Sequence, residues 1–303
     1  MNATPAVPPR HPRRLVFLGT PAASVPALRA LVAAGFEVVL VVSQPDRRRG
    51  RGGATSQSPV KAAALELGLT VTDRVEDAAT VGADLGVVVA YGEILRADLL
   101  AALPMVNIHF SLLPRWRGAA PVERALLAGD DRTGVCIMEV VEALDAGAVH
   151  AVAELPIGPD ATAAELREEL AELGARLLVS TLEAGLGEPT PQAGEPTYAK
   201  KITPRVLHLD WTRPAAELHR VVRVGGAWTT FRERRLRVWD AHVADGPVAG
   251  APGTVALAGG VPVVATGEGA LVLDEVQPEG KGRVPGPAWA NGARLADDEV
   301  LGP

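Results

Sequence analysis

The sequence contains little cysteine, few aromatic residues and no long hydrophobic run. Its 303 residues include one cysteine, Cys136, so the chain cannot form an internal disulfide, and a reducing, cytoplasmic location is expected. Because Cys136 stands in the apolar stretch TGVCIMEVV, we expect a buried core residue and not a nucleophile. No apolar run reaches the roughly 18 residues that a membrane-spanning helix needs, so no membrane association is expected.

Several signatures of function are also missing. The turn after the first apolar stretch lacks the glycine pattern of dinucleotide-binding sites, and neither a P-loop nor a G-x-S-x-G motif occurs. The six histidines are scattered without the spacing of a metal site, so no bound metal is expected. A net charge of −6 gives no general affinity for nucleic acid, and any such contact must come from a local basic patch.

The first half of the chain alternates between apolar strands and amphipathic helices. Uninterrupted Val, Leu and Ile runs are typical of strands buried on both faces, and their alternation with helices predicts an α/β fold with a doubly wound, mostly parallel sheet. Ligands bind such sheets at the carboxyl ends of the strands. The expected strands are 14–19, 37–43, 83–92 and 105–110, and the expected helices are 24–35, 59–68 and 119–129.

The second half has a different pattern of predicted secondary structure. A long helix is predicted over 158–185, with Asp160 or Thr162 as its cap. From residue 206 on, short strands separated by Gly and Pro turns predict a small β-barrel. The expected organisation along the chain is a disordered Pro- and Arg-rich tail, a first domain, a Pro- and Gly-rich linker and a second domain, at residues 1–13, 14–188, 189–205 and 206–303.

Three polar residues are candidates for catalysis. Asn107 and His109 share strand parity, so both side chains point to the same face at a carboxyl end of the sheet. An amide can donate to a developing oxyanion, and an imidazole can move a proton near neutral pH; two satisfied polar residues at a strand end are the alternative. Asp145, in the stretch LDAG, would orient the His109 ring if the two meet, or it merely forms a turn.

Two arginine clusters are candidates for contact with RNA. A flexible arginine loop at the carboxyl end of a strand can grip a phosphate backbone, and a basic surface beside aromatic residues can bind nucleic acid. For both clusters the alternative is an ordinary solvated loop. The first cluster is Arg47, Arg48, Arg49 and Arg51, and the second is Arg232, Arg234 and Arg235, just after Trp228 and Phe231.

The stretch NIHFSLLPRWRGAAP (107–121), with LDAG (144–147), resembles the formyltransferases that use 10-formyltetrahydrofolate. Within that family the chain is similar to the branch that formylates methionyl initiator tRNA. The resemblance implies a Rossmann-like catalytic domain over 14–188 and an OB-like tRNA-binding domain over 206–303. It extends along the chain through the stretches FLGTP, QPDRRRGRG, SPVK, VVVAYGEIL, YAKKI, LDW and GAWTTF.

The resemblance also assigns roles to individual residues. Asn107, His109 and Asp145 match the catalytic residues, and Arg51 matches the loop arginine that engages the tRNA, with the other clustered arginines as further tRNA contacts. Phe110 departs from the family, because many members carry Gly there. The residues implied to contact the folate are Ser111, Leu112, Leu113, Pro114 and Ile94.

The implied reaction is formyl transfer from 10-formyltetrahydrofolate to the α-amino group of methionyl initiator tRNA, for translation initiation, by a monomer that needs no metal. Two alternatives stay open. One is an enzyme of the same fold that formylates a small amine, such as an aminosugar nucleotide or glycinamide ribonucleotide, or hydrolyses the formyl donor. The other is a non-catalytic nucleic-acid-binding protein with an OB-like domain.

Overall fold

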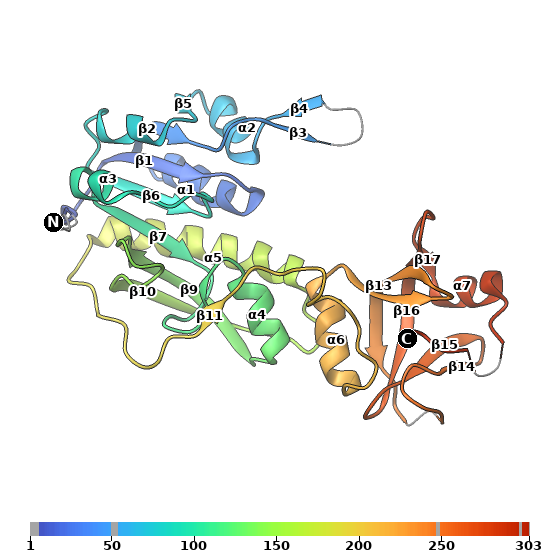
Figure 1. Cartoon of the computed structure of the whole chain (residues 1–303). Coiled ribbons are helices and arrows are strands. Elements are labelled where there is room, and N and C mark those ends of the chain that lie inside the picture. The colour runs from blue at the N-terminus through green and yellow to red at the C-terminus, as the bar shows by residue number, and fades with distance from the viewer. Residues whose placement is uncertain (1–5, 50–53, 247–248, 297–298, 303) are drawn as a thin grey trace. The chain divides into compact units, whose positions relative to one another are not determined.

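The computed structural model describes residues 6–49, 54–246, 249–296 and 299–302, and the chain forms two compact units (Figure 1). The two units interleave along the sequence, since two short stretches that precede residue 167 cluster with the C-terminal residues. The first unit is Met1–Pro121, Arg132–Pro156 and Arg167–Ala199, and the second is Val122–Asp131, Ile157–Leu166 and Lys200–Pro303.

A seven-stranded sheet forms the centre of the first unit, in the order β10-β9-β7-β6-β1-β2-β5. The strands from β7 to β5 in this order are parallel, and β9 and β10 are antiparallel to their neighbours. The predicted α/β fold with a mostly parallel sheet is therefore confirmed. The strands are β1 (Arg14–Gly19), β2 (Glu37–Val42), β5 (Val71–Thr72), β6 (Leu85–Val89), β7 (Met105–His109), β9 (Arg132–Glu139) and β10 (Val149–Pro156).

The order of the strands changes direction between β1 and β6. From β1 the sheet grows through β2 and β5 on one side and through β6 and β7 on the other, so the loops after β1 and β6 run in opposite directions, as at the ligand-binding edge of doubly wound sheets. β6 is buried along its whole length, which explains its unbroken apolar sequence. The surrounding helices are η1 (Ala22–Ser24), α1 (Val25–Ala33), α2 (Pro59–Glu66), η2 (Val75–Ala79) and α3 (Ala97–Ala102).

The helix starts follow the sequence closely, with one difference. Ser58 caps α2 by accepting a hydrogen bond from the Lys61 N–H. Ser24 stands before α1 but makes no such bond, because its hydroxyl donates to the Val89 carbonyl at the end of β6, at 2.7 Å. In the long helix α5 (Ala163–Ala184), Thr162 and Glu165 bond reciprocally as a capping box, so Thr162 is the cap.

Two small pairs of strands complete the first unit. The arginine hairpin consists of β3 (Arg47–Arg49) and β4 (Ala54–Ser56). β8 (Arg117–Gly118) pairs in parallel with β11 (Tyr198–Ala199), so the middle of the stretch predicted as a linker lies against the loop that follows β7. The described part of the predicted tail is also bonded, since the Ala6 N–H donates to Leu100 and the Arg10 carbonyl accepts from Leu186.

The second unit is built on an antiparallel sheet in the order β12-β13-β16-β15-β14, with β17 beside β16. Backbone bonds from residues 299–302 join its two edges, because Leu301 donates to Gly253 and Gly302 donates to Thr230. Helices α6 and α7 pack on the sheet. The elements are α6 (Ala215–Val224), β12 (Ala227–Phe231), β13 (Arg234–Val243), β14 (Val255–Ala258), β15 (Val261–Ala265), β16 (Ala270–Pro278), β17 (Val284–Pro285) and α7 (Gly286–Ala293).

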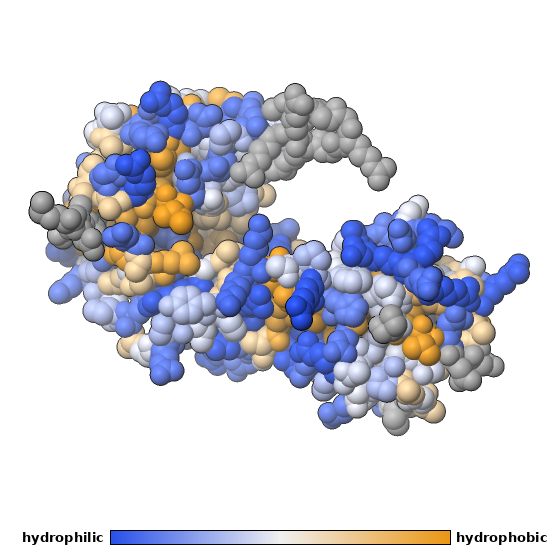
Figure 2. Space-filling view, in the orientation of Figure 1, coloured by the Kyte–Doolittle hydropathy of each residue, from blue (hydrophilic) through white to orange (hydrophobic). Residues whose placement is uncertain are grey.

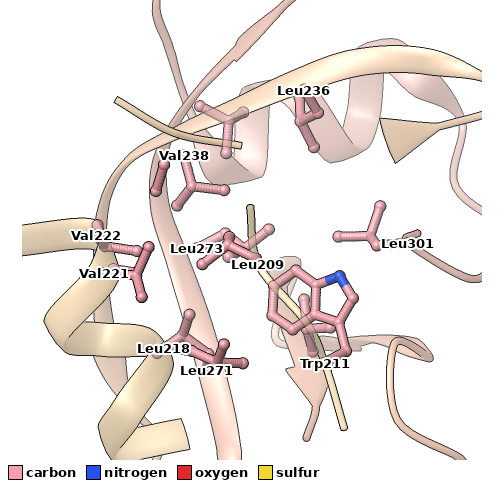
Figure 3. Close-up of a cluster of buried hydrophobic side chains, with 14 of the residues drawn as sticks. Leu209, Trp211, Leu218, Val221, Val222, Leu236, Val238, Leu271, Leu273 and Leu301 are labelled. Carbon is pink, nitrogen blue, oxygen red and sulfur yellow. The ribbon is translucent and has the colours of Figure 1, made fainter. Parts of the chain in front are cut away.

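A large apolar cluster forms the main core of this second unit. Figure 3 shows Trp211 and Leu301 next to each other on one side of the core, with Leu218 and Val221 of α6 on the other side. The Trp211 indole N–H donates to the Thr229 hydroxyl at 3.1 Å, which satisfies the polar atom that burial would otherwise leave unpaired. This core and the joined sheet edges agree with the small β-barrel predicted after residue 206.

The surface is largely polar where Figure 2 shows the second unit, with hydrophilic side chains over much of the visible face. Among the described residues, no helix is both long and apolar enough to cross a membrane. α4 (Pro121–Ala128), the remaining helix, begins at the last residue of the first unit's N-terminal stretch and continues in the second unit.

Candidate active site

Asn107 and His109 lie next to each other on one face of β7, as strand parity predicts. β7 is held between β6 and β9, and His109 stands opposite Cys136 of β9. His109 is 5% exposed, whereas Asn107 is only half-buried. No hydrogen bond joins the Asn107 amide to any part of the chain that the structure describes, so its N–H groups are available to a ligand.

The His109 ring is fixed between a carbonyl and a carboxylate. Its Nε2 lies 2.9 Å from the Trp116 carbonyl oxygen, and because a carbonyl can only accept, Nε2 carries a proton. Its Nδ1 lies 3.7 Å from Asp145 Oδ2. Nδ1 is therefore the ring atom that can take up and release a proton, and Asp145 is the anion beside it.

Asp145 is held in a tight turn, Leu144–Gly147, which we call the Asp145 turn. Its Oδ2 accepts a hydrogen bond from the Gly118 N–H at 2.7 Å, and its backbone has a left-handed φ of 49°. Gly147 is required there, because a Cβ on it would overlap the Glu139 carbonyl oxygen. The structure thus brings together the three predicted catalytic residues.

Two further polar residues belong to this site and are not among those predicted from the sequence, Arg117 and Gln192. The Gln192 amide donates to the carbonyls of Asp145 and Gly147, and its oxygen accepts from the Arg117 guanidinium. Nothing in the local sequence signals Gln192, because it stands in the Pro- and Gly-rich stretch that is typical of a linker.

The segment predicted to contact the folate, Ser111–Pro114, follows β7 directly. Ser111 is fully buried, and its hydroxyl donates to the Arg115 carbonyl at 2.6 Å, so it supports the loop from inside. Leu112, Leu113 and Pro114 are partly exposed. Ile94, in the loop after the neighbouring β6, is 86% exposed, which leaves an apolar side chain uncovered near the same edge of the sheet.

Phe110 does not disturb the site. It alternates with His109 and so points to the opposite face of the sheet. Its ring edge lies 3.7 Å from the position that a Cβ on Gly174 of α5 would occupy, and the Ile108 side chain lies closer still to that position. Phe110 is therefore a packing residue under α5, and its aromatic side chain is matched by a glycine on the helix.

Cys136 is buried, as predicted, and its sulfur accepts a hydrogen bond from the Leu113 N–H at 3.5 Å. Burial raises the pKa of the thiol from 9.0 to about 11. The thiolate, which is the nucleophilic form, is therefore scarce at neutral pH. We regard Cys136 as a structural residue that supports the loop after β7.

This pKa shift predicts a loss of stability at alkaline pH. Between about pH 9 and 11 the unfolded chain has released the Cys136 proton while the folded chain keeps it, so the free energy of unfolding falls as the pH rises. Urea denaturation at pH 8 to 11 should show a shallower fall for Cys136→Ala than for the wild type. Equal slopes in the two proteins would contradict the assignment.

The predicted RNA-contacting arginines divide between the two units. Arg51 lies outside the described residues, and Arg47, Arg48 and Arg49 form strand β3. In the second unit, a cleft of about 360 Å³ is lined by apolar and aromatic residues, by Glu279, and by four cationic residues, Arg232, Arg234, Arg235 and Lys281. The Arg232 guanidinium donates two hydrogen bonds to the Glu299 carboxylate, from Nε to Oε1 at 2.7 Å and from Nη2 to Oε2 at 2.9 Å. This pairing raises the pKa of the guanidinium.

A second cleft of about 780 Å³ also lies within the second unit. Trp228 and His208 both line it, and their rings meet edge to face with their centroids 4.5 Å apart. The Arg235 guanidinium carbon lies over the Trp228 ring, 4.3 Å from the ring centroid. The cleft's cationic residues are Arg124, Arg205 and Arg213. Within the described part of the chain, no group of three or more His, Cys, Asp or Glu side chains could hold a metal ion.

Comparison with known proteins matches both halves of the chain. Residues 13–182 match the family model described as formyl transferase, and residues 201–294 match the formyl transferase C-terminal domain. The chain belongs to the formyl transferase family. A curated relative, the methionyl-tRNA formyltransferase of Symbiobacterium thermophilum, is 46% identical over 301 residues, which cover 92% of each chain.

Solved structures share the fold at low identity. The N-formyltransferase of Helicobacter canadensis, in complex with folinic acid and dTDP-3-aminofucose, gives a TM-score of 0.67 at 15% identity, over 87% of this chain and 98% of that one. HypX of Aquifex aeolicus, in complex with tetrahydrofolic acid, gives 0.64 at 19% identity, over 95% of this chain but only 48% of HypX. These likenesses show the fold.

Proposed function

We propose that this protein transfers the formyl group of 10-formyltetrahydrofolate to the α-amino group of methionyl initiator tRNA, for translation initiation. The observation that carries the proposal is the full-length similarity to methionyl-tRNA formyltransferase, 46% identity over 92% of both chains. The site supports it, because His109 and Asp145 lie 3.7 Å apart and Asn107 shares the face of β7 with His109 at the carboxyl end of the sheet.

His109 acts as the proton carrier in this proposal. The amine must lose a proton as it adds to the formyl carbon, and the leaving nitrogen of the folate must gain one. Nδ1 of His109 is the ring nitrogen free for this exchange, because Nε2 is committed to the Trp116 carbonyl. Asp145, 3.7 Å from Nδ1, stabilises the ring while it carries the extra proton.

Asn107 stabilises the oxygen that gains negative charge. Its amide donates to no described residue, and strand parity places it on the same face as His109. A neutral donor held in a partly dry site stabilises a developing oxyanion strongly, since no solvent has to reorganise. The rest of the rate enhancement comes from holding the amine and the formyl carbon together.

The folate supplies the formyl group as an electrophilic amide. The chain offers apolar side chains for its ring system at the ends of β6 and β7, namely Ile94, Leu112, Leu113 and Pro114, while Ser111 holds the loop in shape from inside. A pocket of apolar walls with a few convergent polar groups is what a heterocyclic cofactor needs. The residues present therefore fit the co-substrate.

The tRNA is held by the arginines in this proposal. Arg47, Arg48 and Arg49 belong to strand β3 of the arginine hairpin, and Arg51 lies outside the described residues. In the second unit, Arg232, Arg234 and Arg235 line the cleft of about 360 Å³, and Arg232 also donates to Glu299. Contacts of this kind neutralise phosphates, so affinity for the tRNA falls with salt. We further propose that the protein is a monomer in the cytoplasm; the free, buried Cys136 supports a reducing compartment.

An acceptor assay tests the function. The protein is incubated with labelled formyl donor and, in parallel, with methionyl initiator tRNA, uncharged tRNA, free methionine, glycinamide ribonucleotide and an aminosugar nucleotide. The expected result is labelled formyl-methionyl-tRNA and no label on the other acceptors. Transfer to a small amine, or hydrolysis of the donor, without transfer to methionyl-tRNA would contradict the proposal.

A further inference from the structure

The Asp145 turn is held by one side chain that comes from far along the sequence. Gln192 Nε2 lies 2.9 Å from the Asp145 carbonyl oxygen and 2.8 Å from the Gly147 carbonyl oxygen. The Gln192 amide group therefore donates both of its hydrogen bonds to the Asp145 turn. The left-handed backbone of Asp145 is disfavoured for a residue with a Cβ and persists where neighbouring groups hold it.

Gln192 is itself held in place by Arg117. The Gln192 Oε1 atom accepts from Arg117 Nε at 3.0 Å and from Arg117 Nη2 at 2.6 Å. The next residue, Gly118, donates its backbone N–H to Asp145 Oδ2 at 2.7 Å. The bonds therefore form a closed circuit from the Asp145 carboxylate through Arg117 and Gln192 back to the Asp145 carbonyl, and every member lies in the first unit.

The same circuit reaches His109. Its Nε2 bonds to the carbonyl of Trp116, the residue before Arg117. The segment 116–118 thus sets both the orientation of the imidazole and the position of the carboxylate. A shift of either by a fraction of an ångström changes the 3.7 Å separation of Nδ1 and Oδ2, and small misplacements of catalytic groups are costly to rate.

We propose that Gln192, braced by Arg117, is a positioning residue for Asp145 and sets the distance between the carboxylate and His109. The inference rests on the proposed function, in which Asp145 supports proton transfer at His109. The stretch 189–205, whose sequence is typical of a linker, then contributes a residue that positions a catalytic group. Gln192 touches no substrate in this proposal and acts through Asp145 alone.

Gln192→Glu is the sharpest test, because it preserves shape and keeps the acceptor for Arg117 while removing both donors to the Asp145 turn. We expect kcat for formyl transfer to fall by about 10- to 100-fold, with little change in the KM for either substrate. Its melting temperature should stay close to that of the wild type. An unchanged kcat in a folded variant would overturn the proposal.

A double-mutant cycle separates positioning from a general structural role. If Gln192 acts through Asp145, Gln192→Glu has no further effect on kcat in an Asp145→Ala background. A residue that only ties the segment to the core would lower kcat by the same factor in both backgrounds, and that result would also overturn the proposal.

A readout that needs no activity keeps this inference distinct from the proposed function. Hydrogen exchange of the amides at residues 144–147 should quicken in Gln192→Glu, while amides of β16 in the second unit stay protected as in the wild type. If the wild type fails to formylate methionyl-tRNA, the proposed function is refuted. If exchange at residues 144–147 is unaltered in Gln192→Glu, the proposed positioning role of Gln192 is refuted.

Discussion

Replacing His109 by alanine is expected to lower kcat/KM for formyl transfer by about 10²–10⁴, the usual contribution of a general acid–base group. The loss follows from the geometry of the ring, whose Nδ1 is the atom free to exchange a proton beside Asp145. Initial rates with methionyl-tRNA at saturating formyl donor measure the effect, and circular dichroism confirms that the variant is folded.

His109→Gln supplies the matched control. A glutamine amide can still donate to the Trp116 carbonyl, which His109 Nε2 does at 2.9 Å, but it cannot carry a proton. We expect this variant to be as inactive as His109→Ala while keeping the loop after β7 in place. If His109→Gln retained close to the wild-type rate, His109 would be a structural residue and the proposed proton transfer would be wrong.

Replacing Asn107 by alanine is expected to lower kcat by about 10²–10³, as for the loss of one oxyanion donor. The side chain is half-buried and the chain's described residues leave its amide unbonded, so its removal breaks no internal hydrogen bond and should cost little stability. The effect should fall on kcat more than on the KM for the tRNA, because the donor is used when charge develops.

Asn107→Asp tests whether the amide N–H is what matters. The substitution keeps the size and shape of the side chain and exchanges its donor for a negative charge. We expect activity no higher than that of Asn107→Ala, since a carboxylate opposes the developing oxyanion. Activity near that of the wild type in either variant would remove Asn107 from the mechanism.

The features that sequence predicted well are those with a local period. The period of two in a strand placed Asn107 and His109 on one face, and the alternation of apolar strands with helices gave the mostly parallel sheet. Of the two caps expected for the long helix, Asp160 and Thr162, the structure uses Thr162. The pairing of His109 with Asp145 was a conditional expectation, and the 3.7 Å separation supports it.

The features that sequence could not predict depend on contacts between distant residues. Gln192 reaches the Asp145 turn across more than forty residues, and its neighbours Pro191 and Gly194 gave only the signal of a loop. The Trp116 carbonyl that fixes the His109 tautomer is a backbone atom, to which no residue type points. The joining of the barrel edges by residues 299–302 likewise leaves no periodic trace.

The interleaved division of the chain bears on how the protein responds to being cut. Residues 122–131 and 157–166 belong to the second unit, where Leu127 packs on the apolar core and Arg223 bonds to the carbonyls of Gly158 and Ala161. A protease that cleaves between residues 189 and 205 therefore does not release the complete second unit, because residues 122–131 and 157–166 stay on the N-terminal fragment. Residues 200–303 expressed alone would expose the apolar surface on which residues 122–131 and 157–166 pack. Co-expression with residues 1–199 would supply these two stretches and bury that surface again.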